Sequence, residues 1–298
     1  MQMNLKSIRQ RLEKEKRIFH NRLMLAISRR KEFNPVFLIG CARSGTTVLG
    51  RTLSNHQEIA YLNEDRILWR KAYPEFDVWS HKSASPKVLA TAKDHSKKAS
   101  QVLADLFYGE QNASRATVLL EKLPINSFRL EFLSEAFPKA KYIYLHRNGL
   151  EVARSIKKKA DAGQWFGKRN LKWLALEKLA HEENLSIENL GNYEKGLIEW
   201  RFSTKMSENF FEQLPSDQYF ALSYESLLKN PVKQLQGIFD YLGLKTPETL
   251  TREWASNFKR SSEVVQEVTE RDVYFGGPNL KKSVHNKFRH TLPLVTNG

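Results

Sequence analysis

The sequence lacks the features that mark secreted and membrane-spanning proteins. It holds a single cysteine, Cys41, so no disulfide can form within the chain. No apolar run approaches the ~20 residues that span a bilayer. The first residues also lack the unbroken apolar stretch of a signal peptide. From these absences we expect a soluble, cytoplasmic protein.

Acidic residues are also in short supply. The 298 residues include 33 Asp and Glu against 48 Lys and Arg, a net charge of +15. Such an excess favours an anionic partner, which a nucleic acid, a membrane surface or a phosphorylated or sulfated small molecule would all satisfy. Charge alone does not choose among these three. Part of it is local, because residues 1–32 hold ten Lys and Arg against three Glu.

Residues 1–32 are predicted to form a basic helix ahead of a single domain over 33–298. Apolar residues recur there at spacings of three, four and seven, which places them on one stripe: Leu5, Ile8, Leu12, Phe19, Leu23 and Ile27. Two interpretations stay open. The stripe packs on the domain, or it docks on a membrane surface or a partner, in which case the protein is peripherally membrane-associated.

Beyond Pro35 the pattern is one of short apolar runs separated by helical stretches. Runs rich in branched and aromatic residues predict buried strands at 36–40, 117–121, 141–146 and 219–223. Helical periodicity is found at 46–54, 95–108, 127–137, 150–159, about 170–212 and 231–242. This alternation predicts an α/β fold with a mostly parallel sheet flanked by helices. The segments 64–95 and 160–200 are predicted insertions that shape an acceptor site.

The first strand runs into a loop of small residues, "GCARSGTT" over 40–47. A strand, a tight turn and a helix start aim backbone N–H groups and the positive helix end at one point, which makes an anion site. The loop nevertheless lacks the lysine of an ATP-binding loop, since Thr46 stands in that position and the cation, Arg43, has moved inside the loop.

A metal-binding carboxylate is missing as well. A kinase needs an acid at a neighbouring strand end to hold Mg²⁺, but the strand 141–146 ends in His146-Arg147-Asn148. The residues therefore favour direct neutralisation of a bound phosphate by arginine, with no metal. A second interpretation stays open, in which the protein is a nucleotide-dependent phosphoryl transferase (kinase) on a similar fold. No nucleic-acid-binding module is recognisable, so we expect no nucleic-acid partner.

Taken together, these motifs resemble those of the sulfotransferases, which use 3′-phosphoadenosine 5′-phosphosulfate (PAPS). "RSGTT" is similar to the P-loop-like phosphosulfate loop of the tyrosylprotein and bacterial carbohydrate branch. "YLHRNGLEVARSI" resembles the 3′-phosphate motif, and "YESLLKNPVKQLQGIFDYLGL" the helical signature near the family's C-terminal end. The likeness spans about 34–244. It departs at 121–124, which read Glu-Lys-Leu-Pro where the tyrosylprotein enzymes have Asn-Lys-x-Pro.

The resemblance implies PAPS as co-substrate, no metal, and a role for each motif. The 5′-phosphosulfate would be bound by the loop residues Arg43, Ser44, Gly45, Thr46 and Thr47, and the 3′-phosphate by Arg147 and Ser155. Lys122, at the end of a predicted strand, would reach the transferring sulfonate. The alternatives are a salt bridge for Arg147 and a solvated strand-end lysine for Lys122.

A base must remove the acceptor's proton. Glu64, in a Glu-x-Arg setting with Arg66, resembles in position the general-base glutamate of the tyrosylprotein enzymes. An exposed Glu–Arg pair at a helix start is the competing interpretation. Histidine is the base in the cytosolic branch, so His56 and His81 are further candidates.

Two features bear on substrates without identifying the acceptor. Family members often close the nucleotide site with a late basic loop, for which Lys281, Lys282 and Ser283 within 275–290 are candidates. The insertions carry aromatic residues that could stack on a sugar or an aromatic ring: Trp69, Trp79, Trp165 and Phe166. A carbohydrate acceptor is favoured, but a lipid headgroup, a peptide tyrosine and a small phenol stay open, as does the oligomeric state.

Overall fold

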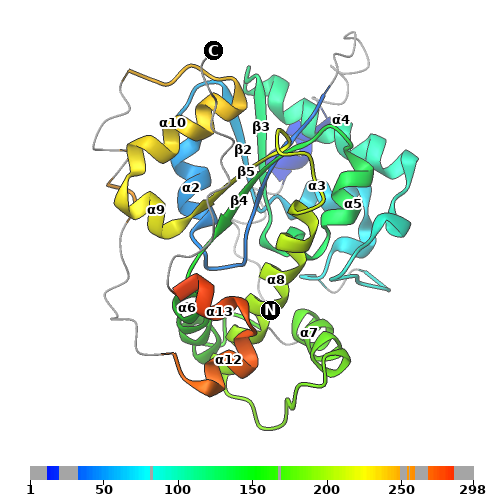
Figure 1. Cartoon of the computed structure of the whole chain (residues 1–298). Helices are drawn as coiled ribbons and strands as arrows, with labels where there is room; N and C mark the ends of the chain where they lie inside the picture. The colour runs from blue at the N-terminus through cyan, green and yellow to red at the C-terminus, as the bar shows by residue number, and fades with distance from the viewer. Residues whose placement is uncertain are drawn as a thin grey trace.

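The computed structural model describes residues 12–19, 33–80, 83–166, 169–248, 254, 256–258 and 268–284. Its centre is a five-stranded sheet in the order β2-β3-β1-β4-β5, with every neighbouring pair parallel (Figure 1). The strands are β1 (Val36–Ile39), β2 (Ile59–Asn63), β3 (Val118–Lys122), β4 (Lys141–His146) and β5 (Tyr219–Ser223). The predicted α/β fold with a parallel sheet is confirmed.

Helices connect the strands and extend beyond them. The α-helices are α2 (Thr46–Leu53), α3 (Arg66–Ala72), α4 (Lys97–Ala113), α5 (Leu130–Ala136), α6 (Gly149–Asp161), α7 (Leu171–Glu182), α8 (Asn192–Phe211), α9 (Tyr224–Lys229), α10 (Pro231–Leu242), α12 (Glu270–Gly276) and α13 (Asn279–Val284). Short 3₁₀ turns are η1 (Pro74–Phe76), η2 (Ala92–Asp94) and η3 (Pro124–Phe128).

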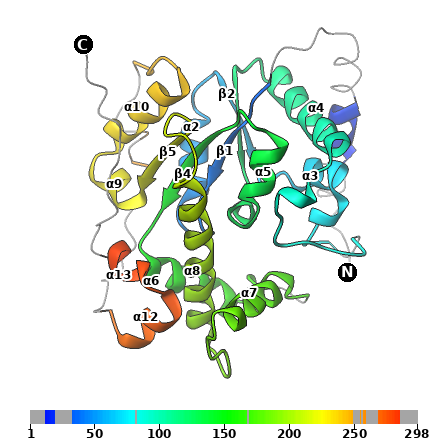
Figure 2. The same cartoon turned by 45° about the vertical axis from the view of Figure 1, so that its right-hand side comes forward.

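The two faces of the sheet build two separate cores because side chains alternate along each strand. On β1, Phe37 and Ile39 pack with α3, α4 and α5, whereas Val36 and Leu38 pack with α2, α9 and α10. Figures 1 and 2 show these helix groups on opposite sides of the sheet, with α6, α12 and α13 together beyond one of its edges. All strands are parallel, so every strand ends at the same edge of the sheet.

Most of the predicted elements are present in the structure, although α3 and α9 were not among the predicted helical stretches. All four predicted strands are present within about a residue, but the five-residue strand β2 was missed. The helical stretch over 170–212 is two helices, α7 and α8, rather than one. The predicted helix end at Leu242 is correct: Gly243 caps α10 in a left-handed conformation, with a φ of 71°.

The described part of the N-terminal segment, 12–19, is helical and lies on the domain. Ile18 is buried in the larger core, and Arg17 forms an ion pair with Glu110 of α4. The packed face differs from the predicted stripe, since Leu12 and Phe19 are exposed. The buried residue is Ile18, next to the predicted Phe19. The face of the helix that packs on the domain is therefore shifted by about one residue from the predicted stripe. The other stripe residues lie outside the described part.

The late basic segment also differs from expectation. Residues 279–284 form helix α13 rather than a loop, and Gly277 supplies the turn after α12 with a φ of 75°. Residues 285–290 lie outside the described part. Among the described residues, no helix is long and apolar enough to cross a membrane.

Candidate active site

The loop between β1 and α2 has the backbone geometry of an anion-binding turn. Gly45 precedes α2 with a φ of 99°, and a Cβ atom there would lie 2.5 Å from the ring of Tyr224, so only glycine fits. No side chain caps α2, so the first N–H groups of the helix are left for another acceptor. The Ser44 hydroxyl is buried and has no hydrogen-bond partner. An anion at this point would satisfy both groups.

Arg43 contacts both Arg147 and Ser155 beside this loop, although it lies more than a hundred residues from either of them in sequence. Arg43 Nε donates to Ser155 Oγ over 3.1 Å, and Arg147 Nη1 donates to the Arg43 carbonyl over 3.3 Å. Burial, and next the charge of Arg147, lowers the pKa of Arg43. Two guanidinium groups that oppose each other in this way favour an anion between them.

Arg147 also has a protein partner, as the alternative interpretation expected. Its Nε donates to Glu151 Oε2 over 3.0 Å, one turn along α6. The guanidinium lies over the ring of Tyr224, 4.5 Å from the centroid. Glu151 and Tyr224, which sequence reasoning missed, therefore orient Arg147. The i,i+4 spacing of Arg147 and Glu151 was the signal for this pair.

Lys122 connects the loop to Glu64. Its side chain is fully buried, and its Nζ donates to Thr47 Oγ1 over 2.9 Å and to Glu64 Oε1 over 2.8 Å. The interpretation as a solvated lysine is wrong. The strand register explains the placement: Asn63 lies opposite Lys122, so the residue after Asn63 turns over the lysine. Glu64 makes this turn with a φ of 56°, and its N–H donates to the Lys122 carbonyl over 2.8 Å.

Two cations hold the Glu64 carboxylate. Besides Lys122, Arg66 Nη2 donates to Glu64 Oε2 over 3.0 Å. Burial acts to raise the pKa of Glu64, but the hydrogen bond and charge of Lys122, followed by Arg66, outweigh it and leave the pKa below its ordinary value. Burial lowers the pKa of Lys122, and Glu64 opposes that shift. The carboxylate is therefore ionised at neutral pH.

The competing histidine His56 lies elsewhere. It precedes β2, at the edge of the sheet opposite the one where Glu64 follows that strand. Its ring is buried, with Nε2 3.1 Å from the Lys245 carbonyl and Nδ1 accepting from the Glu58 N–H. His81 lies outside the described residues.

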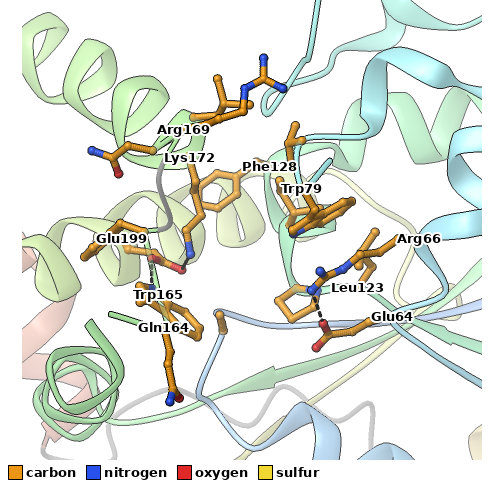
Figure 3. Close-up of a pocket in the computed structure, with 17 residues that line it drawn as sticks. Glu64, Arg66, Trp79, Leu123, Phe128, Gln164, Trp165, Arg169, Lys172 and Glu199 are labelled. Atoms are coloured by element: carbon orange, nitrogen blue, oxygen red, sulfur yellow. Dashed lines mark hydrogen bonds and ion pairs between the residues drawn. The ribbon is translucent and has the colours of Figure 1, made fainter. Parts of the chain in front are cut away.

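A pocket of about 450 Å³ opens next to Glu64, between the two insertions (Figure 3). Glu64, Arg66 and Trp79 lie on one side, and Trp165, Lys172 and Glu199 lie on the other. The floor includes Ala42 of the loop and apolar residues of η3. Both segments that were predicted as insertions shaping an acceptor site, 64–95 and 160–200, contribute residues to the lining of this one pocket.

The aromatic residues of the insertions divide into two groups. Trp79, Trp165 and Phe166 line the pocket, as predicted. Trp69 does not: it is fully buried in the core, and its Nε1 donates to Glu121 Oε1 over 2.9 Å. Lys172 and Glu199 were not identified from the sequence, because nothing in their local pattern distinguishes them from ordinary helix residues.

The predicted basic closing segment contacts the phosphate motif at one point. Ser283 Oγ accepts from the Gly149 N–H over 3.2 Å, at the start of α6. Lys281 is exposed on α13, and the Lys282 side chain lies outside the described part. Helix α13 thus lies against the helix that follows Arg147.

A metal-binding cluster of three or more His, Cys, Asp or Glu side chains is not found among the described residues. The donors at the loop fit a phosphorylated anion instead. They comprise an uncapped helix start, an orphaned buried hydroxyl and two guanidinium groups.

Comparison with known proteins finds sulfotransferases among the relatives of this chain. Protein-tyrosine sulfotransferase A of Caenorhabditis elegans is 21% identical over 218 residues, covering 70% of this chain and 50% of that protein. The nodulation protein NoeE of Sinorhizobium fredii is 30% identical over 127 residues, which cover 41% of this chain and 30% of that protein. The chain thus spans half or less of these two curated relatives.

Solved structures show the same fold. The sulfotransferase domain of the Synechococcus PCC 7002 olefin synthase has a TM-score of 0.50 and 20% identity, with 86% of each chain covered. The sulfotransferase domain of the curacin biosynthetic pathway also has a TM-score of 0.50 and 20% identity, covering 74% of this chain and 77% of its own. The sulfotransferase family profile matches residues 35–248, well over half of the chain, and the protein therefore belongs to the sulfotransferase family.

Proposed function

We propose that this sulfotransferase transfers the sulfuryl group of PAPS to an acceptor hydroxyl in the pocket beside Glu64. The observation that carries the proposal is the chain of contacts from the loop to the pocket: Thr47, Lys122 and Glu64 are joined by hydrogen bonds of 2.9 and 2.8 Å. One buried lysine thereby links an anion-binding turn to a carboxylate that faces a cavity.

The donor would be held at both of its charged ends. The loop N–H groups, the Ser44 hydroxyl and Arg43 would bind the 5′-phosphosulfate, and Arg147 with Ser155 would bind the 3′-phosphate. Arg147 would then contact both Glu151 and the 3′-phosphate. Lys281 and Lys282 are proposed to screen the bound nucleotide from the α13 side. No divalent ion is needed in this scheme, because guanidinium groups supply the positive charge.

A hollow beside α2 offers a place for the adenine ring. It is lined by Val48, Arg51, Thr52, Asn55, Trp254 and Asn257. An indole face with amide and hydroxyl groups around it suits a purine, which stacks on aromatic rings and hydrogen-bonds at its edge. The hollow adjoins the helix whose first turn would bind the phosphate.

When bound, PAPS supplies an activated sulfuryl group. The acceptor oxygen would form a bond to sulfur as the bond from sulfur to the 5′-phosphate oxygen breaks, and the acceptor proton would pass to Glu64. Lys122 and Thr47 would stabilise the charge that grows on the departing oxygen, which favours the transition state over the ground state. Glu64 is ionised beforehand, so it is ready to accept the proton.

A transfer assay with sulfur-labelled PAPS and a panel of hydroxyl acceptors, in the presence of a metal chelator, tests the proposal. We expect labelled product from the wild type, and a loss of at least tenfold in Arg43→Ala but not in Arg115→Ala, an exposed arginine after α4. Transfer of phosphate from ATP that requires Mg²⁺ would contradict the proposal and favour a kinase.

A further inference from the structure

The pocket wall opposite Glu64 is a built hydrogen-bonding site. Glu199 of α8 is almost completely buried, and both of its carboxylate oxygens are used: Oε2 accepts from Trp165 Nε1 over 2.9 Å, and Oε1 accepts from Lys172 Nζ over 2.7 Å. Figure 3 shows these three side chains together on one side of the cavity. Glu199 therefore holds Lys172 and Trp165 in place, with one donor on each carboxylate oxygen.

Lys172 has hydrogen-bonding capacity left for a ligand. An ammonium group carries three N–H donors, and Glu199 takes one of them. The side chain is about a fifth exposed and lines the pocket, with Nζ 4.3 Å from the centroid of the Trp165 ring. A fixed ammonium group at the pocket wall suits an oxygen lone pair of the acceptor.

The charges in the pocket nearly cancel, despite the strongly basic chain. The described lining residues include three cations and two carboxylates, and each carboxylate is paired with a cation of the lining: Glu64 with Arg66, and Glu199 with Lys172. Arg169, the remaining cation, donates to the Ser80 carbonyl over 2.9 Å. An anionic acceptor would gain little here and would lose its hydration.

The walls are also apolar between the polar groups. Trp79, Phe128, Trp165 and Phe166 line the cavity, with Arg66 lying over Trp79. A sugar ring has both an apolar face and hydroxyl groups around its rim, which matches such walls. A simple phenol would fill the apolar part but leave the Lys172 donors without a partner, and sites built for hydrogen bonds reject ligands that lack them.

We propose that Lys172 is a specificity-determining residue that donates hydrogen bonds to a neutral sugar acceptor while the reactive hydroxyl of that sugar lies at Glu64. This inference rests on the proposed function, because it assigns the substrate class of the same pocket. Glu199 acts as a positioning residue through Lys172 and Trp165.

The test compares three acceptor classes with sulfur-labelled PAPS: neutral methyl glycosides, methyl glycosides of uronic acids, and nitrophenol. We expect the neutral glycosides to have the highest kcat/KM. Because Lys172→Met alone would leave Glu199 buried without its cation, the double variant K172M/E199Q removes both charges. In it, the ratio of neutral-glycoside to nitrophenol kcat/KM should fall on the order of tenfold or more. The single variant Lys172→Arg, which keeps a cation beside Glu199, should have a ratio between those of the double variant and the wild type.

A matched control is Lys178→Met, an exposed lysine on the same helix, which should keep the wild-type ratio. An unchanged ratio in K172M/E199Q, or a wild-type preference for uronic acids or nitrophenol, would overturn the assignment while leaving sulfuryl transfer intact. Absence of labelled product with every acceptor, together with failure of 3′-phosphoadenosine 5′-phosphate to bind, would overturn the proposed function itself.

Discussion

Lys122 links the loop before α2 to the carboxylate beside the pocket. It is fully buried, yet it contacts both the loop hydroxyl of Thr47 and the carboxylate of Glu64. Its charge keeps Glu64 ionised, at the cost of making that carboxylate a weaker base than a solvated one. This arrangement favours a reaction in which the base accepts its proton late, after the bond to sulfur has begun to form.

Replacing Glu64 with Gln should lower kcat by ~10²-fold or more and leave donor affinity nearly unchanged, since the amide cannot take up the acceptor proton. Glu131→Gln, an exposed residue at the start of α5, is the control. Steady-state kinetics and donor titration measure both effects. Wild-type turnover in Glu64→Gln would remove it as the base.

The same residue predicts the pH dependence. The pKa of Glu64 is lowered, so the proposed base would be fully ionised above the ordinary glutamate value of 4.5 and would be protonated only as pH falls through the lower pKa. The acid limb of the kcat profile should therefore lie below pH 4.5, as far as the folded enzyme can be followed. A limb near pH 6 to 7 would instead indicate a histidine base.

Arg147 is expected to recognise the 3′-phosphate. Arg147→Ala should weaken binding of 3′-phosphoadenosine 5′-phosphate at least tenfold more than binding of adenosine 5′-phosphosulfate, which lacks the 3′-phosphate, because a charge-assisted pair is lost only with the former. Arg115→Ala provides the exposed control. Equal losses for both ligands would exclude this role for Arg147.

At the scale of elements, the sequence was informative where local physics decides the structure. Strand β1, the glycine turn and helix α2 follow from small residues after an apolar run, and the cap of α10 follows from a glycine, Gly243, directly after the periodic stretch. Strand β2 was missed because its pairing with β3, rather than its own pattern, makes it a strand. Likewise, Lys172 and Glu199 meet only because α7 packs on α8, which the sequence pattern does not specify.

The loop geometry predicts that Gly45→Ala lowers both stability and donor affinity, whereas Gly243→Ala lowers stability alone. Both glycines have positive φ, so each alanine costs roughly 1–2 kcal/mol of backbone strain. Only at Gly45 would the new Cβ also meet the Tyr224 ring, at 2.5 Å, whereas nothing lies within 4 Å at Gly243.

Donor titration and thermal unfolding of both variants check this. Gly45→Ala should lose most of its donor affinity as well as stability, and Gly243→Ala should lose stability alone. Similar donor affinity in the two variants would show that the loop is not the donor site.

At the scale of the whole molecule, a buried polar network supports the pocket wall. Glu121 accepts from Trp69 and Asn126, and Arg129 donates to the carbonyls of Lys87 and Val88 over 2.6 and 3.1 Å. These contacts connect the strand β3 with α3 and η3, and connect Arg129 with residues 87–88. Burial raises the pKa of Glu121 to about 7. Alternating sequence patterns had no means of revealing that a strand residue points to such a network.

Glu121→Gln should change how stability depends on pH. The folded protein binds the Glu121 proton more tightly than the unfolded chain does, so the wild type should lose stability relative to Glu121→Gln as pH rises from 4.5 through about 7. The raised pKa corresponds to on the order of 3 kcal/mol across that window. Denaturant unfolding at several pH values measures it, and parallel curves for the two proteins would contradict the network's role.

Arginine side chains and a helix start are proposed to bind the donor nucleotide without a divalent ion. Calorimetric titration of the full chain with 3′-phosphoadenosine 5′-phosphate in a chelating buffer tests it most directly, with ATP and Mg²⁺ as the comparison. We expect tight binding of the bisphosphate that is unaffected when Mg²⁺ is added, and much weaker binding of ATP. Binding of ATP with Mg²⁺ alone, and none of the bisphosphate, would contradict the account.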